Sequence, residues 1–373
     1  MSVFLRQQAF LDGHLKQMSK RNLFRHTTII FPLLLTFVLL SGGCISPSDN
    51  VSRPTLLKVE DATQEQLVEQ VNRLAKVNSM RAKMYLQFED NSYAEVGIAE
   101  KYKRADGEIV VQRPGKIFLK VQVPFVKTDV AQMTSDGEKF RVAILEDGGS
   151  GKYKKFVIGS NNADYSGLQT EVSQMDFNNK GFKQNVNAFS NLRPQHFTDA
   201  MLMRSIDAAD FSYSQSTILE EEKTPDVAKK SPLKNVLRGY YLLDELRKNQ
   251  DGSLTVSRRF WFDRVGTVRL ARQQIFDERG EIESDITYGK AGNLTETGEY
   301  KDLPLKIEVT RPKEKYKMSL TYQSPESVSI GKTYNAEVFV LENRWSLEEV
   351  DLDKKLQQNG SHKTASASQT PAK

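Results

Sequence analysis

Short runs of alternating apolar and polar residues recur along this chain and limit the folds open to it. Ala82, Met84, Leu86 and Phe88 alternate with more polar residues. Successive side chains of a strand point to opposite faces of its sheet, so this alternation predicts a strand with one buried face. Similar runs predict further strands at 108–111, 117–123, 129–133, 139–145, 153–158, 238–246, 253–263, 268–276, 282–288, 305–310, 316–322 and 336–341. Short strands joined by turns favour an antiparallel sheet over a βαβ fold.

Two helices are expected beside these strands. Thr63 and Gln66 have the spacing of a capping box, and apolar residues follow at helical spacing to about residue 78. Pro194 suits the first turn of a second helix, which is predicted over 194–206. The predicted fold class is therefore α+β, mainly β, with an antiparallel sheet curled over helices.

The first 43 residues have the parts of a secretory leader. A basic segment, 20–25, precedes an apolar stretch, 27–40, which is shorter than the ~20 residues that cross a bilayer. Small residues then lead into Cys44, an order that resembles a bacterial lipobox. The resemblance implies that Cys44 receives a lipid and that residues 1–43 are removed. Met18 is an alternative start, because a leader that begins there has ordinary proportions. The competing interpretation is an uncleaved signal anchor with an incidental cysteine.

Loss of that leader would leave a chain that is close to neutral. The formal net charge is +5, and residues 1–43 hold five basic residues against one acidic residue, so about +1 remains. A near-neutral protein has no global field that would gather nucleic acid, and none is expected as a partner. Ile45-Ser46 lacks the aspartate that retains lipoproteins at the inner membrane in some bacteria. We therefore expect an outer-membrane lipoprotein that faces the periplasm, with the inner membrane as the alternative.

Side chains that usually carry catalysis are scarce in the mature chain. Its only cysteine is Cys44, and His196 is the one histidine between the leader and the tail. This excludes disulfides, and zinc sites built on several cysteines or histidines. His196 is expected to be a partly exposed helix residue, and Arg258–Phe262 an ordinary strand with one charged face. We expect no cofactor, no metal and no enzyme activity, although a hydrolase built on an acidic pair stays open.

The mature chain divides into stretches of different composition. Residues 44–60 lack periodicity and are expected to form a flexible tether. Residues 61–352 are expected to form one domain, whose expanded middle holds a charged loop at 220–232. Residues 353–373 are polar and are predicted to be disordered.

An ordered set of motifs spans residues 107–137. A glycine-led strand runs into Arg113-Pro114, an apolar strand follows and ends before Pro124, and a Ser135-Asp136-Gly137 turn comes last. This set resembles the LolA/LolB lipoprotein-carrier family. The resemblance implies a strongly curved antiparallel half-barrel, closed by helices, around a hydrophobic cavity for acyl chains. It also implies that Arg113 hydrogen-bonds the backbone of a lid and so keeps the empty cavity closed.

Strand alternation adds candidates for the wall of that cavity. One buried face is expected to carry the side chains of Met84, Leu86, Phe88, Ile117, Leu119 and Val121. Such residues can line a pocket or fill a core, and Arg113 can equally be a solvated residue at a strand end. One departure from the family concerns residues 147–152. They are polar, whereas the acceptor branch of the family uses an exposed apolar loop to push its cargo into the membrane.

The predicted function is the binding of a lipid or lipoprotein acyl group in the cavity, in a carrier or sorting role. Its expected partners are acyl chains and, through the anchor on Cys44, the membrane. The alternative is a structural or regulatory envelope lipoprotein that keeps the fold but binds an envelope protein. A concave face filled by bulky side chains would favour this alternative.

Overall fold

The computed structural model describes most of the mature chain. The described residues are 53–93, 98–101, 104–146, 151, 154–163, 165, 193–207, 209–224, 226–228, 230–292, 294, 303–324 and 327–358. The predicted leader, Cys44, most of 147–152, and residues 359–373 lie outside these ranges. Within them, no helix is long and apolar enough to cross a membrane.

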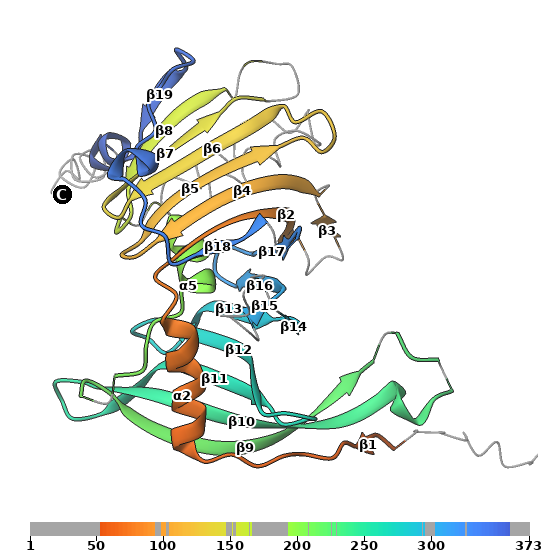
Figure 1. The fold of residues 1–373 in the computed structure, drawn as a ribbon. Coiled ribbons are helices and arrows are strands. Elements are labelled where there is room, and N and C mark those ends of the chain that lie inside the picture. The colour runs from red at the N-terminus through yellow and green to blue at the C-terminus, as the bar shows by residue number, and fades with distance from the viewer. Residues whose placement is uncertain are drawn as a thin grey trace, which may run out of the picture. The chain divides into compact units, whose positions relative to one another are not determined.

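Strands dominate the described residues, which confirms the prediction of a mainly β fold. Seventeen strands join in one mixed sheet that does not close into a barrel. Backbone pairing places its longer strands in the order β9 (Ser212–Lys223), β10 (Asn235–Lys248), β11 (Leu254–Asp263), β12 (Arg269–Phe276), β13 (Ile282–Tyr288), β16 (Lys306–Arg311), β17 (Tyr316–Tyr322), β2 (Ser79–Tyr93), β4 (Ala105–Gln112), β5 (Lys116–Gln122), β6 (Asp129–Asp136), β7 (Lys139–Ile144), β8 (Lys155–Ser160) and β19 (Glu348–Asp351). Neighbours in this order are antiparallel except β8 and β19, which are parallel (Figure 1).

Short strands complete this arrangement. β1 (Thr55–Leu56) runs parallel to β10, and β3 (Ile98–Lys101) and β18 (Ser329–Ile330) pair with β2. β14 (Ala291–Gly292) and β15 (Leu303–Pro304) form a small second sheet.

The long strand β2 joins the N-terminal and C-terminal strands into one sheet. Leu86 of β2 is paired with Leu320 of β17 on one side and with Ala105 of β4 on the other. A Cβ atom at Gly107 would lie 2.6 Å from Cδ1 of Leu86, so β4 needs glycine where it passes this side chain. β4 begins at Ala105, three residues before the strand that was predicted at 108–111.

Both predicted helices are present, and both bury side chains against the sheet. α2 (Gln64–Ala75) begins at the predicted capping box, in which Thr63 N donates to Gln66 Oε1 over 2.9 Å. α5 (Pro194–Met201) is shorter than the predicted 194–206 and packs against β4, β5 and β16. Its end at Leu202 leaves the next residues non-helical, and side chains from the sheet bind their carbonyl groups.

Three predicted segments have a different structure. Residues 336–341 were predicted as a strand, but Ala336–Phe339 is a 3₁₀ helix, η4, that buries Phe339. The predicted loop at 220–232 begins with the last part of β9, because residues 212–223 pair with β10. The ordered region is also wider than 61–352, since β1 lies in the predicted tether and residues 352–358 are helical.

The six side chains predicted to share a buried face belong to one hydrophobic core. Met84, Leu86, Phe88, Ile117, Leu119 and Val121 are at most 6% exposed. They cluster with Leu67 of α2 and Phe197 of α5. This part of the sheet is therefore packed against residues of both helices.

Candidate functional site

A cavity of about 440 Å³ lies beside α2, the end of α5 and the strands β12, β13, β16 and β17. Pockets that hold small molecules usually measure about 300–1,000 Å³ and have mostly apolar walls. Apolar side chains supply most of this lining, among them Met80, Ala200, Met201, Met203, Leu294 and Ile307. Three methionines give the wall flexible side chains that can adapt to an irregular apolar ligand. The cavity is therefore suited to a ligand with an apolar part.

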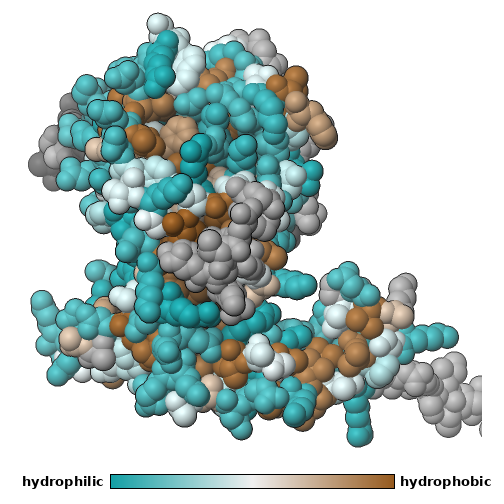
Figure 2. Space-filling view, viewed as in Figure 1, coloured by the Kyte–Doolittle hydropathy of each residue, from teal (hydrophilic) through white to brown (hydrophobic). Residues whose placement is uncertain are grey.

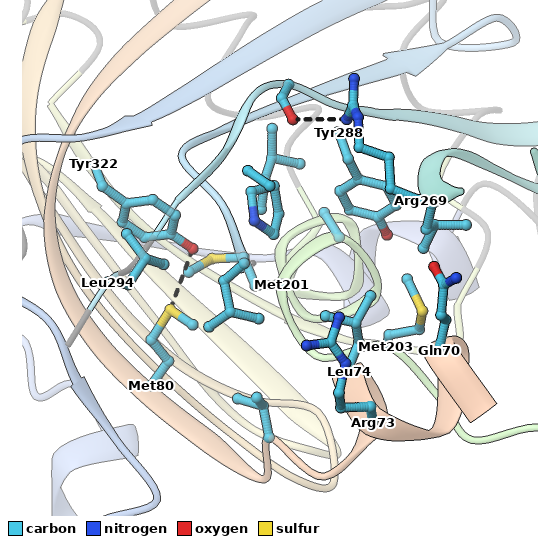
Figure 3. A pocket seen from close by; sticks show the side chains of 18 of the residues that line it. Gln70, Arg73, Leu74, Met80, Met201, Met203, Arg269, Tyr288, Leu294 and Tyr322 are labelled. Atoms are coloured by element: carbon cyan, nitrogen blue, oxygen red, sulfur yellow. Dashed lines mark hydrogen bonds between the residues drawn. The ribbon is translucent and has the colours of Figure 1, made fainter. Parts of the chain in front are cut away.

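The lining is polar on one side. Figure 3 shows Gln70 and Arg269 on one side of the cavity, Met80, Leu294 and Tyr322 on the opposite side, and Arg73 beside Leu74. Gln70 Nε2 donates to Val268 O over 2.9 Å, which ties α2 to the segment before β12. Arg269 Nη1 reaches Gly289 O at 3.5 Å. This separation gives the cavity a polar and an apolar end, as an amphipathic ligand requires.

Two tyrosine side chains bring hydroxyl groups to the wall. Tyr288 is 7% exposed, and its hydroxyl has no hydrogen-bond partner among the residues that the structure describes. The Tyr322 hydroxyl donates to Met80 Sδ over 3.2 Å, and a thioether is a weak acceptor. Burial raises the pKa of both phenols far above its usual range, so both remain neutral donors at physiological pH.

Residues 202–206 follow α5 and carry one lining residue of the cavity, Met203. Arg113, at the end of β4, donates from Nη2 to Met203 O. A hydrogen bond to backbone is the kind of contact that the family resemblance implies for Arg113, and Arg113 is half-buried rather than fully solvated. Burial, and then the charge of Arg204, lower the pKa of the Arg113 guanidinium. Whether this contact controls opening stays a prediction.

A second arginine holds the same segment from the other half of the sheet. Arg258 of β11 donates to Arg204 O over 2.9 Å and to Ser205 O over 3.0 Å. It also forms a salt bridge with Glu245 of β10, and the two side chains are only 2% and 0% exposed. The Tyr213 hydroxyl donates to the same carboxylate over 2.9 Å. Residues 203–205 are thus bound by Arg113, which directly follows β4, and by Arg258 of β11.

The role of Arg258 was not recognised from the sequence. The Arg258–Phe262 run was interpreted as a strand with one charged face, but Arg258 shares strand parity with the buried Phe260 and Phe262. Its neighbour Arg259 faces the other way and pairs with Asp244 at 2.6 Å. An arginine on the same face of a strand as two phenylalanines was the sequence signal for a buried, paired charge.

His196 is 3% exposed, so the expectation of a partly exposed helix residue was wrong. The Tyr316 hydroxyl contacts its Nδ1, and Arg193 N donates to the same atom over 3.3 Å. Burial, and then the charges of Arg311 and Arg193, lower the pKa of His196 well below its usual value. The ring is therefore neutral and accepts hydrogen bonds inside the core.

The other predicted site residues lie elsewhere. The six side chains proposed to line a cavity are packed in the core cluster, and the 440 Å³ cavity has other lining residues. Cys44 lies outside the described residues. These assignments stay predictions.

An exposed apolar loop, which the sequence analysis did not single out, connects β5 and β6. Phe125 is 96% and Val126 is 72% exposed, and Figure 2 shows hydrophobic residues at this end of the hairpin. The available signal was an apolar run, residues 123–126, placed between two strands. Residues 147–152, whose polar sequence departs from the family pattern, lie mostly outside the described residues.

Comparison with known proteins gives matches among solved structures alone. Neither a family model nor a curated protein sequence matches this chain. A LolA superfamily protein from Nitrosomonas europaea is similar with a TM-score of 0.37 and 9% identity, over 75% of this chain and 99% of the other. A domain described as an outer membrane lipoprotein-sorting protein domain, from Vibrio parahaemolyticus, has a TM-score of 0.31 and 10% identity, over 73% and 94%.

Proposed function

We propose that this protein binds the acyl part of a lipid or lipoprotein in the 440 Å³ cavity and takes part in lipid or lipoprotein sorting in the envelope. The observation that supports this most is the cavity itself, with apolar walls and polar groups at one end. Each buried CH₂ group of an acyl chain contributes about 0.8 kcal/mol, so a single chain that fills the cavity would bind firmly. The protein acts by binding, without catalysing a reaction.

The large sheet would curve around this ligand as a half-barrel, with α2 and α5 on its inner face. Residues 202–206 would act as the movable part of the wall, because their carbonyl groups are held by two side chains, Arg113 and Arg258. A few charge-assisted hydrogen bonds of about 1.5–3 kcal/mol each can bias a two-state segment without locking it. Arg113 is the latch in this proposal.

Two features of the chain support the proposed location at a membrane. Lipidation of Cys44 would anchor the mature protein in the outer membrane, with the domain facing the periplasm. The exposed side chains of Phe125 and Val126 offer an apolar contact for the membrane surface. Together they favour transfer of the ligand at a membrane over storage.

Lipid extraction tests the proposed function. A chain that begins at residue 45 is expressed in cells, whose membranes supply lipids. It is purified without detergent and analysed by native mass spectrometry. We expect one lipid or acyl-bearing ligand per chain. Ala291→Trp should reduce the occupancy, because Ala291 is half-buried and lines the cavity. Ala163→Trp is the matched control, since Ala163 is also half-buried but packs outside the cavity. Absence of ligand from the wild type would contradict the proposal.

The alternative is a regulatory or structural lipoprotein that binds an envelope protein. The observation that favours it is the packed face of β2, β4 and β5, where bulky side chains such as Phe88 leave little exposed surface. A ligand-free wild-type protein that captures a single envelope partner through this domain would support it.

A further inference from the structure

Tyr288 places an unused hydrogen-bond donor on the wall of the apolar cavity. The residue ends β13 and is 93% buried, and no described residue accepts a hydrogen bond from its hydroxyl. Leaving a buried polar group unpaired costs about 1–3 kcal/mol, so such groups usually have a partner. Tyr288 lines a cavity large enough for a ligand, so a ligand oxygen that comes to lie against this side chain can supply the missing partner.

The position of Tyr288 limits the chemistry of that ligand. The carbonyl oxygen of the next residue, Gly289, accepts a hydrogen bond from Arg269, which lies on the same side of the cavity as Gln70 (Figure 3). The opposite side, with Met80 and Leu294, offers apolar atoms and the hydroxyl of Tyr322. An acyl ester matches this order, because its carbonyl oxygen lies between a polar head and a hydrocarbon chain.

We propose that the cavity binds an ester-linked lipid whose acyl carbonyl accepts a hydrogen bond from Tyr288, with the head group toward Arg269 and the chain toward Met80 and Leu294. This inference rests on the proposed function and specifies its ligand. The Tyr288 phenol is suited to the role because burial raises its pKa, so it donates a proton without ionising. An ether-linked lipid of the same length has no carbonyl and leaves the hydroxyl unpaired.

Binding of two matched probes tests the proposal. The probes are a lysophospholipid with an ester-linked chain and its ether-linked analogue of equal chain length, and affinity is measured by calorimetry on delipidated protein. The wild type should prefer the ester by about two- to tenfold, which corresponds to one neutral hydrogen bond. Tyr288→Phe should bind both probes with equal affinity. Tyr334→Phe removes another buried hydroxyl that has no partner among the described residues but does not line this cavity, so it should keep the preference of the wild type.

Other outcomes separate this inference from the proposed function. Equal binding of ester and ether by the wild type, or a preference that persists in Tyr288→Phe, would overturn the carbonyl contact while cavity binding stands. A preference lost in Tyr322→Phe, at the opposite side of the cavity, but kept in Tyr288→Phe would place the carbonyl at the wrong end and overturn the orientation. Failure of the wild type to bind either probe would overturn the inference and the proposed function together.

Discussion

Replacing Arg258 with methionine removes the positive member of a buried ion pair and leaves the negative one in place. Arg258 and Glu245 are 2% and 0% exposed, so no solvent compensates the remaining carboxylate. The arginine donates to Glu245 Oε1 over 2.8 Å, to Arg204 O over 2.9 Å and to Ser205 O over 3.0 Å. Breaking a buried pair by removing one partner costs about 3–5 kcal/mol. Arg258→Met should lower the free energy of unfolding by that amount, a large share of the about 5–15 kcal/mol that holds a domain folded.

The neighbouring residue provides a matched control. Arg259→Met breaks the pair with Asp244, whose two side chains are 31% and 18% exposed, and should cost about 1 kcal/mol or less. The double variant Arg258→Met with Glu245→Leu should recover part of the loss, because no buried charge is left unpaired. Urea unfolding gives the free energy of unfolding of all three variants, and an unchanged m-value shows that the comparison concerns stability alone. An Arg258→Met variant that is no less stable than Arg259→Met would refute the argument from burial.

Three further predictions concern the latch, the buried histidine and the anchor. Arg113→Leu removes the hydrogen bond to Met203 O, so it should speed the release of a fluorescent acyl probe by about tenfold. The far-UV circular dichroism spectrum should stay unchanged. Release at the wild-type rate would count against a latch. Because the pKa of His196 is lowered in the folded state, the unfolded chain binds more protons below about pH 6.5, and stability should fall as the pH decreases from 7 to 5.5. His196→Gln should flatten that decrease, and an equal slope in both proteins would show that another group causes it. Cys44→Ala should abolish metabolic labelling with a fatty acid and leave the chain uncleaved or soluble, whereas unchanged labelling would exclude Cys44 as the lipidation site.

Short-range sequence patterns predicted the helices and strands that depend on interactions between residues close together in the chain. The capping box of α2 and the alternation along β2 and β5 are short-range patterns, and the structure contains all three elements. β9 was missed because an edge strand that is mostly exposed shows no apolar alternation, and its backbone pairing with β10 decides its structure. Residues 336–341 were assigned wrongly for a related reason. Leu341 N donates to Thr134 Oγ1 over 3.1 Å, a tertiary contact that no local pattern reveals.

The candidate site was less predictable than the fold. Its lining comes from α2, the end of α5 and strands as distant as β17, so its residues meet only through the tertiary fold. Apolar alternation cannot distinguish a pocket from a packed interior, and the six predicted lining residues, which include Met84 and Ile117, lie in the core. The contact of Arg113 with 202–206 could be anticipated because the motif around Arg113 resembles a known family. No comparable motif marked Arg258 or Tyr288.

The most direct test of the central claim is to locate the bound acyl chain. A fatty acid with a photoactivatable diazirine near its methyl end is bound to the delipidated protein and irradiated, and the labelled residues are identified by mass spectrometry of peptides. Binding in the 440 Å³ cavity predicts labels on Met80, Met201 or Leu294, together with loss of labelling when an unlabelled lysophospholipid competes. Labels confined to exposed residues such as Phe125 would contradict the claim that this cavity is the ligand site. Labelling that does not saturate as the probe concentration rises would contradict it as well.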